Sequence, residues 1–132
     1  MIAGLLLFAI SVCFSCSSLP NLDAYFGVIA ARAIVTPINT RLTSQEVTYI
    51  LDHSGAKLIL VDHECLHLLP TNRVTTIVCC DTGRAGDPYE EFLSLGRKFS
   101  RERGWAGLDV EPDEETGAVL CYTYVIHMDA SF

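Results

Sequence analysis

Residues 42–62, LTSQEVTYILDHSGAKLILVD, contain a helix with its own start and stop signals, followed directly by an apolar strand. Thr43 is a favourable N-cap residue, and Glu46 stands three positions later, which is the spacing of a capping box. Gly55 provides the C-terminal stop. The apolar stripe of this helix consists of Val47, Ile50 and Leu51. The stretch therefore predicts one complete helix-to-strand unit.

The strand in this unit, residues 57–62, is continuously apolar and does not alternate with polar residues. Such runs are typical of parallel strands that are covered on both faces. A second run of this kind, TTIVCCD, follows at residues 75–81. Runs of this type that are separated by helices predict an α/β fold, here a partial doubly wound, mainly parallel sheet flanked by helices.

The other elements continue the same alternation outward from the central unit. We predict a strand over residues 5–14, an extended piece over 34–37, a short helix over 63–70, a helix over 89–103, a charged connector over 104–116 and a last strand over 117–122. A helix is also predicted over residues 21–33. Its expected core-facing residues are Leu22, Phe26, Ile29, Ala30 and Ala33.

Ligands of parallel sheets bind beyond the carboxyl ends of the strands. The places to expect chemistry are therefore the loops that follow Asp62, Asp81 and Tyr122.

The composition limits the classes of partner. Half of the residues are hydrophobic, which predicts a globular chain, and the net charge is −7. This charge argues against nucleic acid as a partner, because that binding relies on clustered Lys and Arg. The basic run at residues 97–103 is offset by the acidic run at 109–115, so both are expected to be solvated.

The first eighteen residues, MIAGLLLFAISVCFSCSS, allow two interpretations. An apolar run followed by small residues resembles a secretory leader, but no Lys or Arg precedes it. It is also shorter than the about 20 residues that cross a membrane. A buried central strand is favoured over a leader, and membrane anchoring is not expected. The six cysteines show no paired metal-ligand spacing and are expected to be buried thiols.

Two short motifs suggest chemistry, but neither has the context that the chemistry requires. His63, Glu64 and His67 match the H-E-x-x-H pattern of zinc proteases, which needs a long helix and a third ligand. Here Pro70 ends the helix after about two turns, so a capped turn is favoured over a zinc site. Residues 81–83 spell Asp-Thr-Gly, but the aspartic-protease mechanism needs two carboxylates and no second copy occurs. The residues by themselves therefore predict no catalytic group and no metal site.

A series of short segments resembles a known family. In order along the chain they are FGV at 26–28, ARA at 31–33, INTRL at 38–42, ILDHS at 50–54, VD at 61–62 and YEEFLSLG at 89–96. They are similar in sequence and spacing to the AMP-forming acyl-CoA synthetases of the adenylate-forming superfamily, over roughly residues 20–123. Arg32 departs from the family pattern, which has a small residue there.

The resemblance implies a reaction and its cofactors. Such enzymes use ATP and Mg²⁺ to convert a carboxylic acid, often a fatty acid, to an acyl-adenylate, and then transfer the acyl group to CoA. The family's phosphate loop reads Tyr-Thr-Ser-Gly-Thr-Thr-Gly-x-Pro-Lys. This chain matches it at Tyr122 and Thr123 and then departs, with Tyr124, Val125 and Ile126 in place of Ser-Gly-Thr.

The resemblance therefore implies a truncated acyl-CoA synthetase, part of the large N-terminal domain, that is inactive alone. Expected regions are an apolar start at 1–18, a partial AMP-binding domain at 19–123 and a divergent tail at 124–132. Tyr122 and Thr123 are the expected nucleotide-binding remnant, and this chain itself is expected to hold no cofactor. The expected location is the cytoplasm or an organelle such as a peroxisome or mitochondrion.

Two alternatives remain open at this point. One is a noncatalytic binding or regulatory module that pairs with a full-length relative. The other is a small secreted zinc protein that uses His63 and His67.

Overall fold

The computed structural model describes residues 10–14, 19–71, 74–80, 82–104, 115 and 117–123, with the backbone alone for 10–14 and 19–22. The elements, in order, are β1 (Ile10–Phe14), α1 (Leu19–Ala30), β2 (Ile34–Pro37), α2 (Ser44–Ser54), β3 (Leu58–Asp62), the 3₁₀ helix η1 (His63–Leu68), β4 (Thr75–Cys79) and α3 (Pro88–Arg103).

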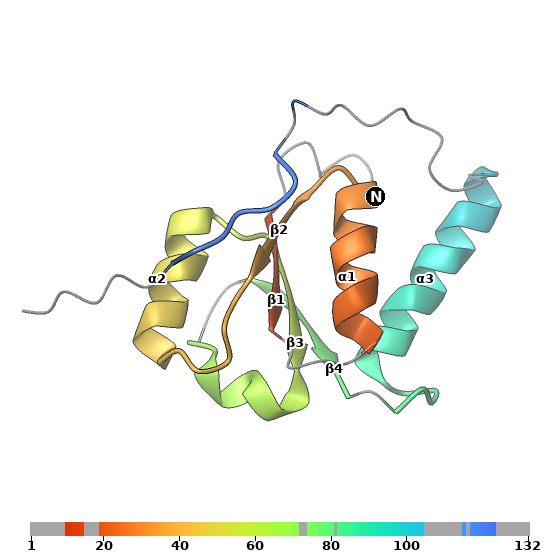
Figure 1. The fold of residues 1–132 in the computed structure, drawn as a ribbon. Coiled ribbons are helices and arrows are strands. Elements are labelled where there is room, and N and C mark those ends of the chain that lie inside the picture. The colour runs from red at the N-terminus through yellow and green to blue at the C-terminus, as the bar shows by residue number, and fades with distance from the viewer. Residues whose placement is uncertain are drawn as a thin grey trace, which may run out of the picture.

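The four strands form one parallel sheet in the order β2-β1-β3-β4. Figure 1 shows α1 and α3 on one side of this sheet and α2 with η1 on the other. The predicted α/β fold class, a doubly wound parallel sheet flanked by helices, is confirmed. The chain connections change direction at β1: the connection to β2 goes to one side of β1, and β3 lies on its other side.

The core explains why the strand at 57–62 is apolar without alternation. Ile59 and Val61 pack with α2 and η1 in one cluster, whereas Leu60 packs with α1 and α3 in another. Both faces of β3 are thus buried, so neither face can carry polar side chains.

Helix α2 has the predicted capping box. The Thr43 backbone N–H donates to Glu46 Oε2 at 2.7 Å, and the Glu46 N–H donates to Thr43 Oγ1 at 3.4 Å. Gly55 ends the helix in the left-handed conformation, with φ of 66°.

Helix α1 corrects two predictions. It ends at Ala30 and not at residue 33, because Arg32 adopts a left-handed conformation with φ of 56°. The Arg32 N–H donates to Ile29 O at 2.9 Å and the Ala33 N–H to Val28 O at 3.0 Å. This pair of hydrogen bonds is a Schellman motif, and Val28 and Ala33 make its apolar contact.

The buried face of α1 also differs from the predicted one. Ala24 and Val28 are buried, whereas Phe26 is 70% exposed and Ile29 is exposed. The helix is apolar on nearly all sides, so the spacing of its apolar residues does not indicate which side faces the sheet. Ala24 packs in the cluster that contains Leu60 of β3, and Val28 packs against Val35 of β2 with Tyr25 half-buried beside it.

The remaining elements agree with the sequence in part. Strand β1 lies within the predicted range 5–14, whose residues 5–9 lie outside the described residues. Most of the predicted connector 104–116 lies outside them as well. The predicted strand at 117–122 is reduced to one parallel bridge between Val119 and Val35. Within the described residues no helix is long and apolar enough to cross a bilayer.

Candidate functional site

A pocket of about 210 Å³ lies beyond the carboxyl end of β2. Its lining comes from three places: the end of β2 with the loop that follows, the inner face of α2, and the segment 117–123. The lining residues are Pro37, Ile38, Asn39, Leu42, Glu46, Ile50, Tyr122 and Thr123.

The segment 117–123 reaches this pocket by running alongside β2. The Val35 N–H donates to Ala118 O at 3.0 Å, and the Leu120 N–H donates to Val35 O at 2.9 Å. Because the pairing is parallel, the residues after Leu120 continue past the carboxyl end of β2. Figure 1 shows this segment, in blue, passing from β2 to α2.

Tyr122 is held by side chains of α2. Its hydroxyl lies 2.8 Å from Nδ1 of His53, and its ring packs against the apolar cluster under α2. Burial raises the pKa of the Tyr122 phenol above its usual value of 10.0, and Tyr49 acts in the same direction. Tyr122 is therefore neutral at physiological pH.

Glu46 gives the pocket a negative charge. The Thr43 backbone N–H and then its hydroxyl lower the pKa of the Glu46 carboxyl below its usual value. The carboxylate is thus ionised at neutral pH, and the capping box already uses its Oε2 atom. Asn39 is also engaged, because its Oδ1 accepts the Arg41 N–H at 2.9 Å.

The chain belongs to a known family by direct comparison. The family model described as "AMP-binding enzyme" matches residues 18–123, which is most of the chain.

This protein is a member of the AMP-binding enzyme family.

Several curated relatives of this AMP-binding family member are named as CoA ligases. It is 29% identical over 117 residues to a 3-methylmercaptopropionyl-CoA ligase of Ruegeria pomeroyi, an alignment that covers 78% of this chain and 20% of that protein. It is 40% identical over 68 residues to the peroxisomal trans-cinnamate:CoA ligase of Petunia hybrida, covering 42% of this chain and 12% of that protein. The chain therefore spans about a fifth or less of the length of these relatives.

Solved structures show the same fold at lower identity. The Mycobacterium tuberculosis fatty acyl CoA synthetase superposes with a TM-score of 0.63 at 22% identity, over 92% of this chain and 23% of that one. The N-terminal domain of FACL13 from the same organism gives a TM-score of 0.64, over 92% of this chain and 30% of that one. These superpositions confirm that the family member has the fold of part of an N-terminal adenylate-forming domain.

The H-E-x-x-H residues of this family member do not form a shared metal-binding face. They lie on the 3₁₀ helix η1, where residues four apart are about 120° apart around the axis, whereas an α-helix separates them by about 40°. His67 Nδ1 lies 2.8 Å from Glu64 O, and His63 Nδ1 lies 3.2 Å from Asp62 Oδ1. Within the described ranges, no group of three or more His, Cys, Asp and Glu side chains is placed to hold a metal.

The other two expected sites contain local turns. The Asp62 carboxylate accepts the Glu64 N–H at 3.0 Å and thereby caps η1. Asp81 lies outside the described residues. Its neighbour Thr82 donates through N–H and hydroxyl to Asp87 Oδ2, at 3.2 and 2.9 Å. Of the three expected places, the one at Tyr122 borders the pocket, which Tyr122 and Thr123 help to line.

Two residues that make structural hydrogen bonds near these sites were not identified from the sequence. His53 had no apparent partner, because its contact with Tyr122 spans 69 positions. Asp87 carried a usable signal, since an Asp followed by Pro88 is a typical N-cap and first helical residue. The cysteine prediction holds for Cys65 and Cys79, which are buried thiols, and is wrong for Cys121, which is exposed.

Proposed function

We propose that this chain is part of an acid–CoA ligase of the adenylate-forming type. The parent reaction joins a carboxylic acid to AMP at the expense of ATP, releases pyrophosphate, and then transfers the acyl group to CoA. ATP, Mg²⁺ and CoA are the cofactors of that parent reaction. The relatives whose names are CoA ligases support this reaction class.

One observation links the proposed function to particular residues. The parallel pairing of the segment 117–123 with β2 brings Tyr122 and Thr123 to the rim of the pocket at the carboxyl end of that strand. Open α/β sheets bind ligands at this end. These two residues also match the start of the family's phosphate loop, and we assign them as its remnant.

The pocket is too small to hold a whole nucleotide. Its volume of about 210 Å³ is below the range of about 300–1,000 Å³ typical of small-molecule pockets. The ionised Glu46 also repels a bare polyphosphate. In the parent enzymes we expect the glycine-rich part of the loop to hold the phosphates, because only glycine lets a backbone approach them closely. Tyr124, Val125 and Ile126 stand there in this chain.

We therefore infer that these 132 residues do not form acyl-adenylates by themselves, and we assign no catalytic residue. Residues 19–123 form the partial AMP-binding domain, with 1–18 as an apolar start and 124–132 as a divergent tail. The proposed compartment is the cytoplasm or an organelle. The name of the Petunia relative, which is described as peroxisomal, supports an organelle.

The first experiment measures ATP–pyrophosphate exchange by the purified chain with a panel of fatty and aromatic acids. We expect no acid-dependent exchange above background. A full-length CoA ligase under the same conditions is the positive control. Acid-dependent exchange by the chain alone would contradict the inference.

The second experiment tests the assignment of Tyr122 and Thr123. Residues 124–131 are replaced by the family's Ser-Gly-Thr-Thr-Gly-x-Pro-Lys, so that the loop continues from Thr123. We expect the grafted chain to gain binding of ATP with Mg²⁺, seen as a shift of the Thr123 amide resonance. The matched control carries alanine at both loop glycines and is expected to gain none. If the chain with the glycine loop also gains no ATP binding, the assignment of Tyr122 and Thr123 is wrong.

A further inference from the structure

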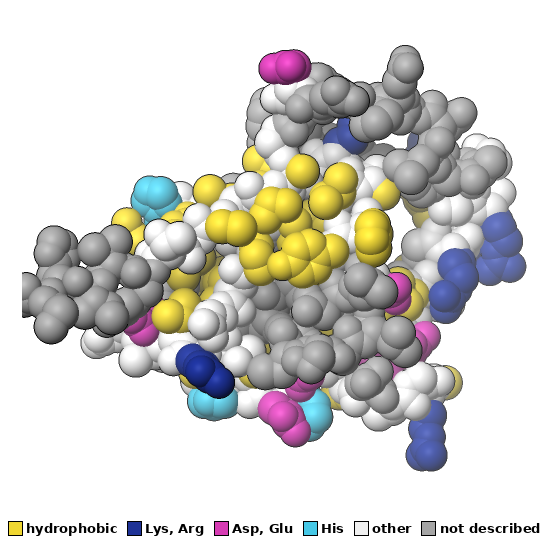
Figure 2. All heavy atoms as spheres, viewed as in Figure 1, with side chains coloured by type: hydrophobic (Ala, Val, Ile, Leu, Met, Phe, Trp, Pro, Cys, Tyr) yellow, Lys and Arg dark blue, Asp and Glu magenta, His cyan; other side chains and the backbone are white. Residues whose placement is uncertain are grey.

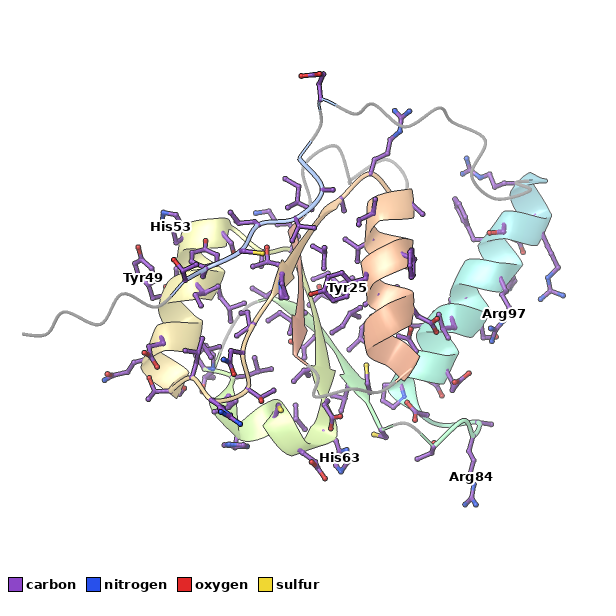
Figure 3. All side chains as sticks on the ribbon, in the orientation of Figure 1. Tyr25, Tyr49, His53, His63, Arg84 and Arg97 are labelled. Atoms are coloured by element: carbon purple, nitrogen blue, oxygen red, sulfur yellow. The ribbon has the colours of Figure 1, made fainter. Side chains whose placement is uncertain are left out.

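Three aromatic side chains from two distant parts of the chain meet beside the pocket. Tyr49 and His53 lie four residues apart on the outer side of α2, where Figure 3 labels both. Their rings stack with centroids 5.6 Å apart and an angle of 21°. Tyr122 approaches the His53 ring edge-on, with centroids 5.8 Å apart and an angle of 84°.

The polar contact within this cluster joins His53 to Tyr122. Nδ1 of His53 lies 2.8 Å from the Tyr122 hydroxyl, which is within hydrogen-bonding distance. A neutral phenol can donate to an unprotonated Nδ1 or accept from a protonated one, so the bond is available to either form of the imidazole. The Tyr49 ring packs on the face of the same imidazole.

The segment 117–123 is thereby attached at two successive points. The backbone hydrogen bonds at Ala118 and Leu120 attach it to β2, and the side chain of Tyr122 attaches it to α2. With the backbone hydrogen bonds to β2 alone, Tyr122 and Thr123 could adopt several directions. Two attachments on different elements set the direction in which the chain leaves the sheet.

We propose that His53 is a positioning residue for Tyr122 and Thr123, the two residues assigned above as the remnant of the phosphate loop. By holding Tyr122, it determines where Thr123 lies at the pocket. This inference rests on the assignment of Tyr122 and Thr123 under the proposed function, since it gives His53 its role in that same site.

The first test uses the chain as it is and needs no nucleotide. We compare the wild type with His53→Leu, Tyr122→Phe and His53→Asn by amide hydrogen exchange. His53→Leu and Tyr122→Phe remove the bond, and the Leu120 amide is then expected to exchange about 3- to 10-fold faster, as the loss of one hydrogen bond predicts. His53→Asn keeps a polar group near the position of Nδ1 and is expected to restore slow exchange. His67→Leu, a change at an exposed histidine on η1, is the matched control.

The α2 amides of Ile50 and Leu51 separate positioning from general stability. If the proposal holds, these amides exchange at the wild-type rate in all variants. Unchanged exchange at Leu120 in His53→Leu and Tyr122→Phe would overturn the proposal. So would equal acceleration throughout α2, or a failure of His53→Asn to restore slow exchange. If His53→Leu does not fold, Tyr122→Phe decides the result.

The second test places the same variants in the chain that carries the glycine loop graft. His53→Leu is expected to weaken binding of ATP with Mg²⁺ about 3- to 10-fold, and His53→Asn to restore it. If the graft itself binds no ATP, the proposed function fails, and the exchange measurement still decides whether His53 holds the segment. If the graft binds equally well with and without His53, the positioning role is wrong.

Discussion

At the scale of single residues, Arg32 is the position where the backbone restricts the choice of side chain most clearly. Its φ of 56° lies in the left-handed region, which costs an ordinary L-residue about 1–2 kcal/mol. The Schellman motif requires this conformation, since it lets Arg32 and Ala33 cap the last carbonyls of α1.

We expect Arg32→Gly to raise the free energy of unfolding by about 0.5–1 kcal/mol. The relieved strain exceeds the added conformational entropy of glycine in the unfolded chain, which is about 0.5–1 kcal/mol. Urea unfolding followed by circular dichroism measures the difference. Arg32→Ala removes the same side chain but keeps a Cβ atom, so it is expected to give no such gain. Equal stabilisation by both variants would show that the arginine side chain, and not the backbone, causes the effect.

At the scale of elements, the start of α3 depends on one buried carboxylate. Asp87 accepts the Tyr89 N–H at 3.0 Å, and its other oxygen accepts two hydrogen bonds from Thr82. Burial would raise the pKa of Asp87, but the hydrogen bonds from Thr82 and Tyr89 outweigh it and lower the pKa below its usual value of 3.8. The helix start and the preceding turn therefore depend on the ionised form.

We expect Asp87→Ala to lower the free energy of unfolding by about 1–2 kcal/mol at pH 7, as the loss of a strong N-cap predicts. Because the folded pKa is depressed, the contribution of Asp87 is complete well above the usual pKa of 3.8 and is lost as the pH falls through the folded pKa. Asp87→Asn keeps a capping side chain and should lose less stability, with a weaker acid dependence between pH 5 and pH 2.

Urea titrations across this pH range provide the measurement for the Asp87 variants. Asp52→Asn, at an exposed carboxylate on α2, is the control and should leave the acid dependence close to that of the wild type. The same acid dependence in Asp87→Asn as in the wild type would contradict the role of Asp87.

The elements that could be predicted from sequence are those with local signals. The α2 capping box and Gly55 lie within a few residues of the helix they bound, and the apolar run of β3 follows from burial on both faces. The buried face of α1 could not be predicted, because the helix is apolar almost all round. The 3₁₀ form of η1 and the single bridge at Val119 depend on contacts with other elements, as does the pairing of His53 with Tyr122.

At the scale of the whole molecule, the exposed apolar surface is the most prominent feature. Figure 2 shows hydrophobic side chains gathered on the face where α1 and the segment 117–123 border β2. Exposed apolar residues on these elements are Phe26, Ile29 and Val119. Contiguous apolar surface of this kind marks a site of association or aggregation.

We expect the isolated chain to self-associate, and more strongly at high salt. The net charge of −7 opposes association at low ionic strength, and salt screens this repulsion. The double variant Phe26→Ser and Ile29→Ser should shift the chain toward the monomer in sedimentation velocity. Leu95→Ser, at an exposed leucine on α3, is the matched control with little expected effect. A wild-type chain that stays monomeric at all salt concentrations would contradict the prediction.

The contact between His53 and Tyr122 also has a consequence for the order of folding. It closes a loop of 69 residues, for which the length-dependent entropy cost is about 4 kcal/mol. The βα units up to β4 close shorter loops and gain their burial first. The rim of the pocket is therefore expected to assemble last and to open first on unfolding. A nascent or partly unfolded chain would then have its four-stranded sheet before it has the pocket beyond β2.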